Sequence, residues 1–281
     1  MKKNGKKILL LSVAAVLLAA LTLWIVLDDF RVQTTEYTVT MTQLPASFEG
    51  LRIAQVSDLH NSKLGDLEGP LLKQLRDAAP DLIVLTGDLA DFYRTDIDRA
   101  LTFVREAAEI APTYYITGNH EARLKTEEQE QLFQGLTDAG VTILRNEAAT
   151  VDRNGASITL VGLEDPDFGN DLEAALDRLL PAEGVSLVLS HRPEYFDAYC
   201  SAGVQLVFAG HAHGGQFRLP FIGGLAAPGQ GLFPKYDCGL YQKGETQMLV
   251  SRGVGESLFP FRVNNPPELV VAILTSDSNN H

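Results

Sequence analysis

The chain has 281 residues, of which 45% are hydrophobic and 21% charged, as in an ordinary globular protein. Its net charge of −13 argues against nucleic acid as a partner, because duplex binding relies on clustered Lys and Arg. A phosphate ester is not excluded, since bound metal ions can supply positive charge locally. The two cysteines, Cys200 and Cys238, form no CxxC motif, which argues against thiolate zinc sites. They either stay unlinked or pair in an oxidising compartment.

Residues 8–27 form an uncharged, apolar run near the N-terminus. A helix of about 20 residues is roughly 30 Å long, which matches the hydrocarbon core of a bilayer. Lysines at positions 2, 3, 6 and 7 precede the run, and aspartates at 28 and 29 follow it. Because positive flanks stay in the cytoplasm, we predict a single-pass anchor over 1–28, with the rest of the chain on the extracytoplasmic side. A cleaved signal peptide is the alternative, although its apolar region is usually shorter and ends at a small-x-small site.

Beyond the anchor, apolar strand patterns alternate with amphipathic helix patterns. We predict strands at 36–42, 51–57, 81–86, 113–117, 141–144, 158–163, 185–190, 204–209, 247–252 and 268–274, and helices at 68–79, 95–110, 127–139 and 170–180, with Pro193 opening a further helix. This alternation indicates an α/β fold with buried sheets, and the strands are too many for one small sheet. Residues 276–281 are polar and predict a disordered tail, which leaves 29–275 as the folded domain.

Almost every predicted strand ends in a residue that can bind a metal ion. These residues are Asp58, His60, Asp88, Asn119, His120, His191, His211 and His213. Five of the six histidines belong to this set, and the sixth is the terminal His281. The carboxyl ends of strands in α/β sheets converge on one rim, so we expect one site there. Because side chains alternate along a strand, the pairs Asp58/His60 and His211/His213 should each point to one side.

The residue types in this set favour transition metals. Imidazole together with carboxylate and amide oxygens suits Mn²⁺, Fe²⁺/³⁺ or Zn²⁺ better than calcium or magnesium, which prefer shells made only of oxygen. We therefore expect a transition-metal site.

Five motifs, in this order along the chain, resemble the calcineurin-like metallophosphoesterase family over about residues 51–252. They are Asp58-Leu59-His60, Gly87-Asp88, Gly118-Asn119-His120-Glu121, Ser190-His191 and Gly210-His211-Ala212-His213. The stretches 210–216 and 227–231 are similar to the membrane-anchored YkuE-like branch of that family. The resemblance implies a four-layer αββα sandwich with two facing mixed β-sheets, to which the sequence adds one N-terminal transmembrane helix.

The resemblance also implies two divalent metal ions. One would be held by Asp58, His60, Asp88 and His213, and the other by Asp88, Asn119, His191 and His211, with Asp88 as the bridge. His120 would be a catalytic residue that contacts the substrate, and Glu121 would orient it. Glu121 stands where the family commonly has Asp, and Ala212 where it commonly has Thr. The first of these departures leaves the partner of His120 open.

These features predict a hydrolase that cleaves a phosphomonoester, phosphodiester or pyrophosphate through a metal-bridging hydroxide. Residues 219–234 combine Gly and Pro with large apolar side chains, so this loop either packs on its own core or forms a lip for a lipid-linked substrate. By analogy with relatives, such a substrate would resemble UDP-2,3-diacylglucosamine. The predicted outward topology argues against this substrate, because a nucleotide sugar is cytoplasmic. We expect Asp91, Arg123 and Arg192 to be solvated or supporting residues.

Three other functions compete with this prediction. A non-catalytic, membrane-anchored binding module would have lost metal ligands, yet the expected ligands are all present. A peptide hydrolase would carry an HExxH motif, which the sequence lacks. A structural envelope protein would use metals only for its stability. The expected partners are the phosphate ester and the membrane, and the sequence indicates no obligate protein partner.

Overall fold

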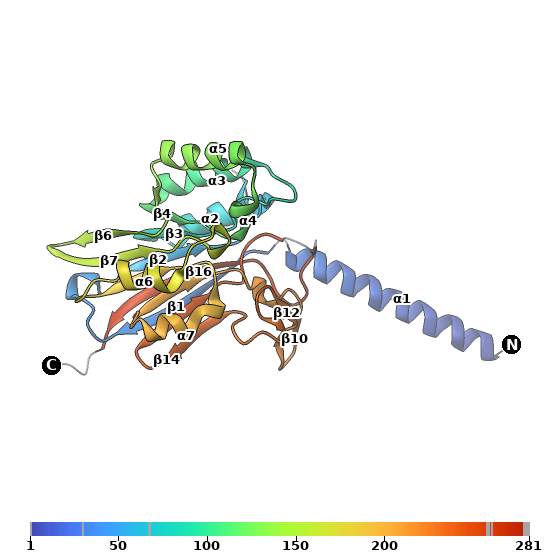
Figure 1. Cartoon of the computed structure of the whole chain (residues 1–281). Helices are drawn as coiled ribbons and strands as arrows, with labels where there is room; N and C mark the ends of the chain where they lie inside the picture. Colours follow the sequence, from blue (N-terminus) through green and yellow to red (C-terminus); the bar gives the residue numbers. More distant parts are fainter. Residues whose placement is uncertain (1, 30, 67–68, 257–258, 260, 278–281) are drawn as a thin grey trace.

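The computed structural model describes all residues except 1, 30, 67–68, 257–258, 260 and 278–281. Two stacked β-sheets flanked by helices form the body, and a long N-terminal helix projects from one end of it (Figure 1).

The first sheet has six strands in the order β1-β16-β2-β3-β4-β5. β16 pairs antiparallel with β2, whereas the other neighbours are parallel, so the sheet is mixed. The strand bounds are β1 Gln33–Met41, β2 Arg52–Val56, β3 Leu82–Thr86, β4 Thr113–Ile116, β5 Thr142–Ile143 and β16 Glu268–Ser276.

The second sheet also has six strands, in the order β14-β15-β9-β8-β7-β6. Its central strands are parallel and both edge strands are antiparallel to their neighbours, so this sheet is mixed as well. The strand bounds are β6 Glu147–Arg153, β7 Ala156–Gly162, β8 Ser186–Leu189, β9 Leu206–Ala209, β14 Gly239–Lys243 and β15 Thr246–Val250. Two small antiparallel pairs lie outside the sheets, β10 Arg218–Leu219 with β11 Gly223–Gly224, and β12 Ala226–Ala227 with β13 Gly231–Leu232.

The helices cover the outer faces of both sheets. The first sheet packs against α2 (Pro70–Asp77), α3 (Ile97–Ile110) and α5 (Thr126–Asp138), and the second against α6 (Leu172–Leu179) and α7 (Phe196–Ser201). Between the sheets lies a third cluster of buried side chains that both sheets contribute to, including Val84 and Phe208. The chain therefore folds into the expected αββα sandwich of two mixed sheets. Shorter helices are α4 (Asn119–Arg123), η1 (Ala46–Phe48), η2 (Lys63–Gly65), η3 (Pro166–Phe168), η4 (Pro193–Tyr195) and η5 (His213–Gly215).

The central strands form where the sequence is continuously apolar. All five residues of β3 are buried, because one face meets the other sheet and the opposite face meets helices. The predicted central strands and helices are therefore confirmed. The sequence missed the edge strands β6 and β14, since only Val151 of these strands is buried and an edge strand depends mainly on its partner. Ser276, expected in the tail, is the last residue of β16, and residues 278–281 lie outside the described part.

The N-terminal helix α1 spans Lys2–Asp29 and comprises 28 residues. Apolar side chains along it are exposed, with Leu10 at 74% and Leu17 at 64%. Within the described part of the chain, no helix meets the length and apolarity that a bilayer crossing requires. The transmembrane anchor stays a prediction. Cys200 and Cys238 are free thiols in this structure.

Candidate metal centre

The residues that the sequence placed in one site do come together, at the rim where strands of both sheets end. Asp58, Asp88 and Asn119 follow β2, β3 and β4 of the first sheet. His191 and His211 follow β8 and β9 of the second. All eight predicted residues are buried, with exposed fractions of 6% or less. The shared rim thus brings together side chains from positions 58 to 213.

The backbone at these positions is not extended, contrary to the expectation that Asp58/His60 and His211/His213 continue the strands. Positive φ angles occur at Asp58 (51°), His60 (46°), Asp88 (51°), His211 (66°) and His213 (48°). Such left-handed conformations are uncommon for residues other than glycine and cost of order 1–3 kcal/mol each. Tight turns, rather than strand alternation, therefore aim each pair of side chains into the site.

Two glycines allow these turns to approach one another. Gly87 has a φ of 88°, and a Cβ there would lie 2.7 Å from the backbone nitrogen of Gly118. A Cβ on Gly118 would lie 2.2 Å from Oδ1 of Asp88. The close approach lets Asp88 Oδ1 accept a hydrogen bond of 2.8 Å from the backbone N–H of His120. The turns after β3 and β4 are thereby joined.

One group of candidate ligands consists of Asp58, His60 and His213. The Nε2 atoms of His60 and His213 are 3.3 Å apart, and His213 Nε2 lies 3.4 Å from Asp58 Oδ1. The Asp58 carboxylate also accepts the backbone N–H of His211 at 3.1 and 3.2 Å, which connects the turns after β2 and β9. These three side chains match the non-bridging ligands expected for one metal ion.

A second group consists of Asp88, His191 and His211. Asp88 Oδ2 lies 3.2 Å from His191 Nε2 and 3.6 Å from His60 Nε2, so one oxygen atom faces both groups. His191 Nδ1 lies 2.8 Å from the carbonyl oxygen of Thr86. Because a carbonyl only accepts, Nδ1 carries the proton and donates it, which leaves Nε2 directed at Asp88. The position of Asp88 is the one that a bridging ligand requires.

The charge states of three of the histidines and of Asp88 suit metal binding, whereas His191 differs. Burial lowers the pKa values of His60, His211 and His213, which favours the neutral imidazoles that ligate metals. Burial alone would raise the pKa of Asp88, but the neighbouring His191, His120 and His60 outweigh it and hold that pKa well below its usual range. Burial likewise opposes protonation of His191, yet Asp88 raises the pKa of His191 to about 10. The ionised Asp88 thus attracts positive charge in a buried place.

Several buried polar atoms in the site lack a hydrogen-bond partner within the described part of the chain. They are Asn119 Oδ1, His191 Nε2, His60 Nδ1 and His213 Nδ1. Buried polar groups are normally hydrogen-bonded, so a cluster of such atoms calls for a ligand. Asn119 and His191 are residues that the family resemblance assigned to the second metal ion. The donor set therefore fits a pair of divalent cations.

His120 lies beside this site, and Asp91 is its carboxylate partner. His120 Nδ1 is 3.5 Å from Asp91 Oδ1, and its Nε2 is 3.9 Å from Asp88 Oδ2. Burial lowers the pKa of His120, but the hydrogen bond to Asp91 and the charge of Asp88 outweigh it, so the net shift is upward. Asp91 is fully buried and is also held by Arg94 Nη2 at 3.1 Å. Of the two roles expected from the sequence, solvated or supporting, Asp91 has the supporting one.

Glu121, in contrast, does not orient His120, and this correction has a clear physical reason. Its carboxylate accepts the backbone N–H groups of Asp88, Leu89, Ala90 and Gly118, at 2.7 to 3.1 Å. Both oxygens are thus used to hold the turn after β3 against the turn after β4. Glu121 is a structural support of the site. The sequence did contain a signal for Asp91 as the partner of His120. Asp91 follows Asp88 by three residues in the same turn, which places it close to the site.

A cavity of about 500 Å³ opens over the second group of ligands. Asp88, Asn119, His120 and His211 are among its polar lining residues, and Arg123 and Arg192 lie on its wall. The remaining wall is apolar and comes largely from the loop after His213, through Phe217, Leu225, Pro228 and Leu232, together with Phe259. The candidate metal ligands thus share one cavity with cationic and apolar side chains.

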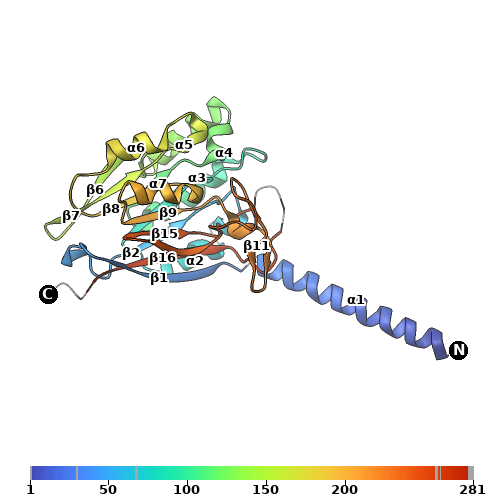
Figure 2. The ribbon, with the colours of Figure 1, turned by 60° about the horizontal axis from the view of Figure 1, so that its bottom comes forward.

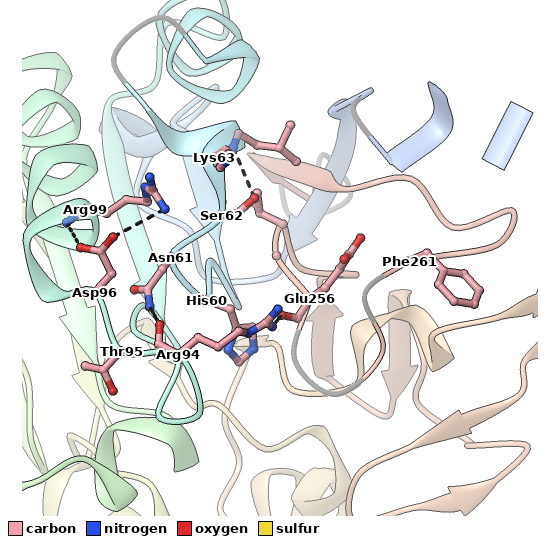
Figure 3. A pocket seen from close by; sticks show the side chains of 13 residues that line it. His60, Asn61, Ser62, Lys63, Arg94, Thr95, Asp96, Arg99, Glu256 and Phe261 are labelled. Carbon is pink, nitrogen blue, oxygen red and sulfur yellow. Dashed lines mark hydrogen bonds and ion pairs between the residues drawn. The ribbon is translucent and has the colours of Figure 1, made fainter. Parts of the chain in front are cut away.

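A larger cavity of about 780 Å³ lies on the side of His60 (Figure 3). Most of its lining residues are polar, among them Asn61, Arg94, Asp96 and Arg99. Asn61 Nδ2 donates to the carbonyl oxygen of Arg94 at 2.8 Å, which fixes the segment that carries Asp91 and Arg94. This cavity therefore borders the residues that support His120.

The loop at 219–234 does not pack entirely on its own core, which was one of the two interpretations of its sequence. Phe221 is fully exposed, and Ile222, Leu232 and Phe233 are 63%, 71% and 59% exposed. β10 to β13 give the loop its shape through two short antiparallel pairs. Of these four side chains, Leu232 also lines the 500 Å³ cavity.

An αββα sandwich whose strand ends gather two His/Asp groups around a shared carboxylate defines a metal-dependent hydrolase of phosphoric esters. The chain belongs to the calcineurin-like phosphoesterase family, whose sequence profile matches residues 51–215. Members of this family use two metal ions, and the clusters of this chain fit that use.

Curated relatives agree with this assignment. The chain is similar to the metallophosphoesterase YkuE of Bacillus subtilis (strain 168), at 33% identity over 89% of this chain and 88% of that protein. It is 32% identical to the phosphodiesterase YaeI of Escherichia coli (strain K12), over 78% of this chain and 80% of YaeI. A transmembrane protein with a metallophosphoesterase domain from Danio rerio is 29% identical over 84% of this chain, which spans 56% of that protein.

We expect Asp88→Asn to lose both metal ions, because the oxygen that faces both ligand groups would belong to a neutral amide or be replaced by an NH₂ group. Elemental analysis of the purified full chain measures this. Asp81→Asn is a matched control, since Asp81 precedes the other end of β3, and it should keep the wild-type metal content. Wild-type metal content in Asp88→Asn would contradict the bridge.

Asp91→Asn and Glu121→Gln should affect different properties. Asp91→Asn should lower kcat by about 10- to 100-fold with metals retained, as expected for the loss of a group that orients a site residue. Glu121→Gln should instead lower the free energy of unfolding by about 1–3 kcal/mol, because its amide NH₂ would face backbone donors. Steady-state hydrolysis of bis(p-nitrophenyl) phosphate and urea unfolding measure the two effects. The reverse pattern would restore Glu121 as the partner of His120.

Proposed function

We propose that this chain is a manganese-dependent phosphodiesterase whose substrate carries an apolar group. The observation that carries this proposal is the 500 Å³ cavity, which joins the candidate metal ligands to an apolar wall. The ions would be held by Asp58, His60, Asp88, Asn119, His191, His211 and His213. When bound, two divalent cations supply an activated water and neutralise charge on the phosphoryl oxygens.

His120 has the properties of the group that assists the leaving oxygen. It lines the cavity, and Asp91 contacts its Nδ1, which leaves Nε2 on the side of Asp88. Against the effect of burial, the hydrogen bond to Asp91 and the charge of Asp88 raise the pKa of His120, and proton transfer by such a group contributes typically 10²–10⁴-fold to a rate. His120 therefore protonates the leaving oxygen in this proposal, and His120→Ala should retain metals and lose most turnover.

The apolar wall favours a diester over a monoester. A monoester of a small alcohol would leave Leu225, Leu232 and Phe259 without a partner, whereas a diester can place an acyl or alkyl group against them. The name of the relative YaeI, a phosphodiesterase, supports the same choice. A phosphomonoesterase is the second candidate, and the substrate comparison below separates the two.

With Mn²⁺, the full chain should cleave a long-chain alkyl p-nitrophenyl phosphate with a higher kcat/KM than bis(p-nitrophenyl) phosphate, and p-nitrophenyl phosphate least of all. Leu232→Ser should reduce the advantage of the alkyl diester by about tenfold, since burying several methylenes contributes about 0.8 kcal/mol each. Leu240→Ser changes an exposed leucine outside the cavity lining. This control should leave the advantage of the alkyl diester unchanged. Preference for p-nitrophenyl phosphate would instead identify a monoesterase.

We further propose that α1 anchors the enzyme in a membrane with the catalytic body on the extracytoplasmic side. Exposed leucines along α1, the four lysines at its N-terminal end, and the Danio rerio relative named as a transmembrane protein support this. Both views place the β10–β13 loop at the end of the body from which α1 leaves (Figures 1 and 2). The exposed Phe221 and Ile222 would then face the same membrane.

The full chain, expressed in bacteria, should stay with membranes after alkaline carbonate washing. Protease added to protoplasts should digest its body from outside. Replacing the four N-terminal lysines by glutamine should make the orientation mixed, because positive charge determines which flank stays inside. Extraction by carbonate, or protection of the body in intact protoplasts, would contradict the anchor or its orientation.

A further inference from the structure

Arg192 follows the candidate ligand His191 directly and is held in place by a buried carboxylate. Its Nε donates to Asp165 Oδ2 at 2.6 Å and its Nη2 to Asp165 Oδ1 at 2.8 Å. The Arg192 side chain is 13% exposed and that of Asp165 is fully buried. Two parallel hydrogen bonds between a guanidinium and a carboxylate fix the plane of the guanidinium as well as its position.

The carboxylate side of this pair is itself rigid. The backbone N–H of Asp165 donates to Thr117 Oγ1 at 3.1 Å, and Asp165 Oδ1 accepts the N–H of Asp167 at 2.9 Å. Asp167 joins a second arginine to the wall, since its carboxylate accepts Arg192 Nη2 at 2.9 Å and Arg123 Nη2 at 3.0 Å. Two arginines and two aspartates therefore form one ion-pair network along the cavity.

The pairing with Asp165 uses Nε and Nη2 and leaves Nη1 for another contact. Nη1 lies 3.2 Å from His211 Nε2 and 3.7 Å from Glu194 Oε1, and Arg192 lines the cavity together with Asp88, Asn119 and His120. The carboxylates of Asp165, Asp167 and Glu194 offset the charge of the guanidinium, which allows it to lie beside a site for cations. A phosphoryl group at the cations is an anion whose oxygens match a guanidinium well.

We propose that Arg192 binds the phosphoryl group of the substrate, with Nη1 donating to a non-bridging oxygen, and that Asp165 is the positioning residue that aims it. This inference rests on the proposed function, because it assumes a phosphate ester in this cavity. The bond involves no transfer of atoms: the oxygen accepts and the guanidinium keeps its proton. Arg123 is also on the wall, but its side chain is half exposed and, within the described part of the chain, forms an ion pair with Asp167 alone, so it is less firmly aimed than Arg192.

The competing interpretation is a purely structural ion pair that fastens η3 to the turn after β8. Such a role predicts a loss of stability with an unchanged affinity for phosphate. Arg52 provides a matched control, since it is also partly buried and ion-paired, with Glu36 at 2.6 Å, but begins β2 at the end opposite the site.

The experiment uses the Mn²⁺-loaded full chain and its variants Arg192→Gln, Arg192→Lys and Arg52→Gln. Hydrolysis of bis(p-nitrophenyl) phosphate gives kcat and KM, calorimetry gives the Kd of inorganic phosphate, and elemental analysis gives the metal content. Arg192→Gln should raise that Kd and lower kcat/KM by about 10- to 100-fold, as expected for a lost hydrogen bond to a charged group. Its metal content should be unchanged. Arg192→Lys should fall between it and the wild type, and Arg52→Gln should match the wild type.

A phosphate Kd and kcat/KM within twofold of wild type in Arg192→Gln would overturn the inference. If Arg192→Gln fails to fold, Arg192→Lys, which keeps the charge, tests the inference through the same phosphate Kd and kcat/KM. Failure of the proposed function has a different signature, which is a metal-loaded wild type without turnover. In that case the phosphate Kd of the variants still tests Arg192.

Discussion

The carboxylate of Asp88 is the contact on which the rest of the site depends. Oδ1 accepts the N–H of His120, and Oδ2 faces both His60 and His191, which belong to different sheets. The backbone N–H of Asp88 donates to the Glu121 carboxylate, so both the backbone and the side chain of Asp88 are fixed by hydrogen bonds. Because candidate ligands from both sheets lie beside this carboxylate, the stacking of the sheets and the glycine-permitted approach of the turns after β3 and β4 are conditions for the chemistry.

Backbone strain is the cost of this arrangement. Five of the candidate residues have positive φ angles, which the surrounding hydrogen bonds must stabilise. Asp58 accepts from His211, His60 donates its N–H to the carbonyl oxygen of Asp88, and Glu121 holds four N–H groups. These hydrogen bonds hold the backbone of the turns in place, and pre-organisation of this kind is what electrostatic catalysis requires.

Sequence reasoning found the central strands and the site because both follow from local pattern. A short, continuous apolar run bounded by turn residues, such as β3, is typical of a buried strand, and residues that follow such strands gather at one rim. It failed where the outcome depends on how a turn folds or on distant partners. Asp91 and Glu121 stand at comparable places in their motifs, and only the turn after β3 decides which one meets His120. The pair Asp165–Arg192 joins positions 27 residues apart, and edge strands such as β6 carry little apolar pattern of their own.

A chain with a net charge of −13 must still attract an anionic substrate to its cavity. At physiological salt, charges further than about 8 Å apart are largely screened, so the acidic surface opposes an anionic substrate only weakly, and attraction must come from short contacts. Asp165 and Asp167 hold two arginines on the wall while neutralising them, which allows cationic donors beside a cation site. Such a wall can recognise phosphate but gives little long-range attraction. In the proposed function, the exposed apolar lip supplies the missing affinity, because burial of apolar surface is not weakened by salt or by net charge.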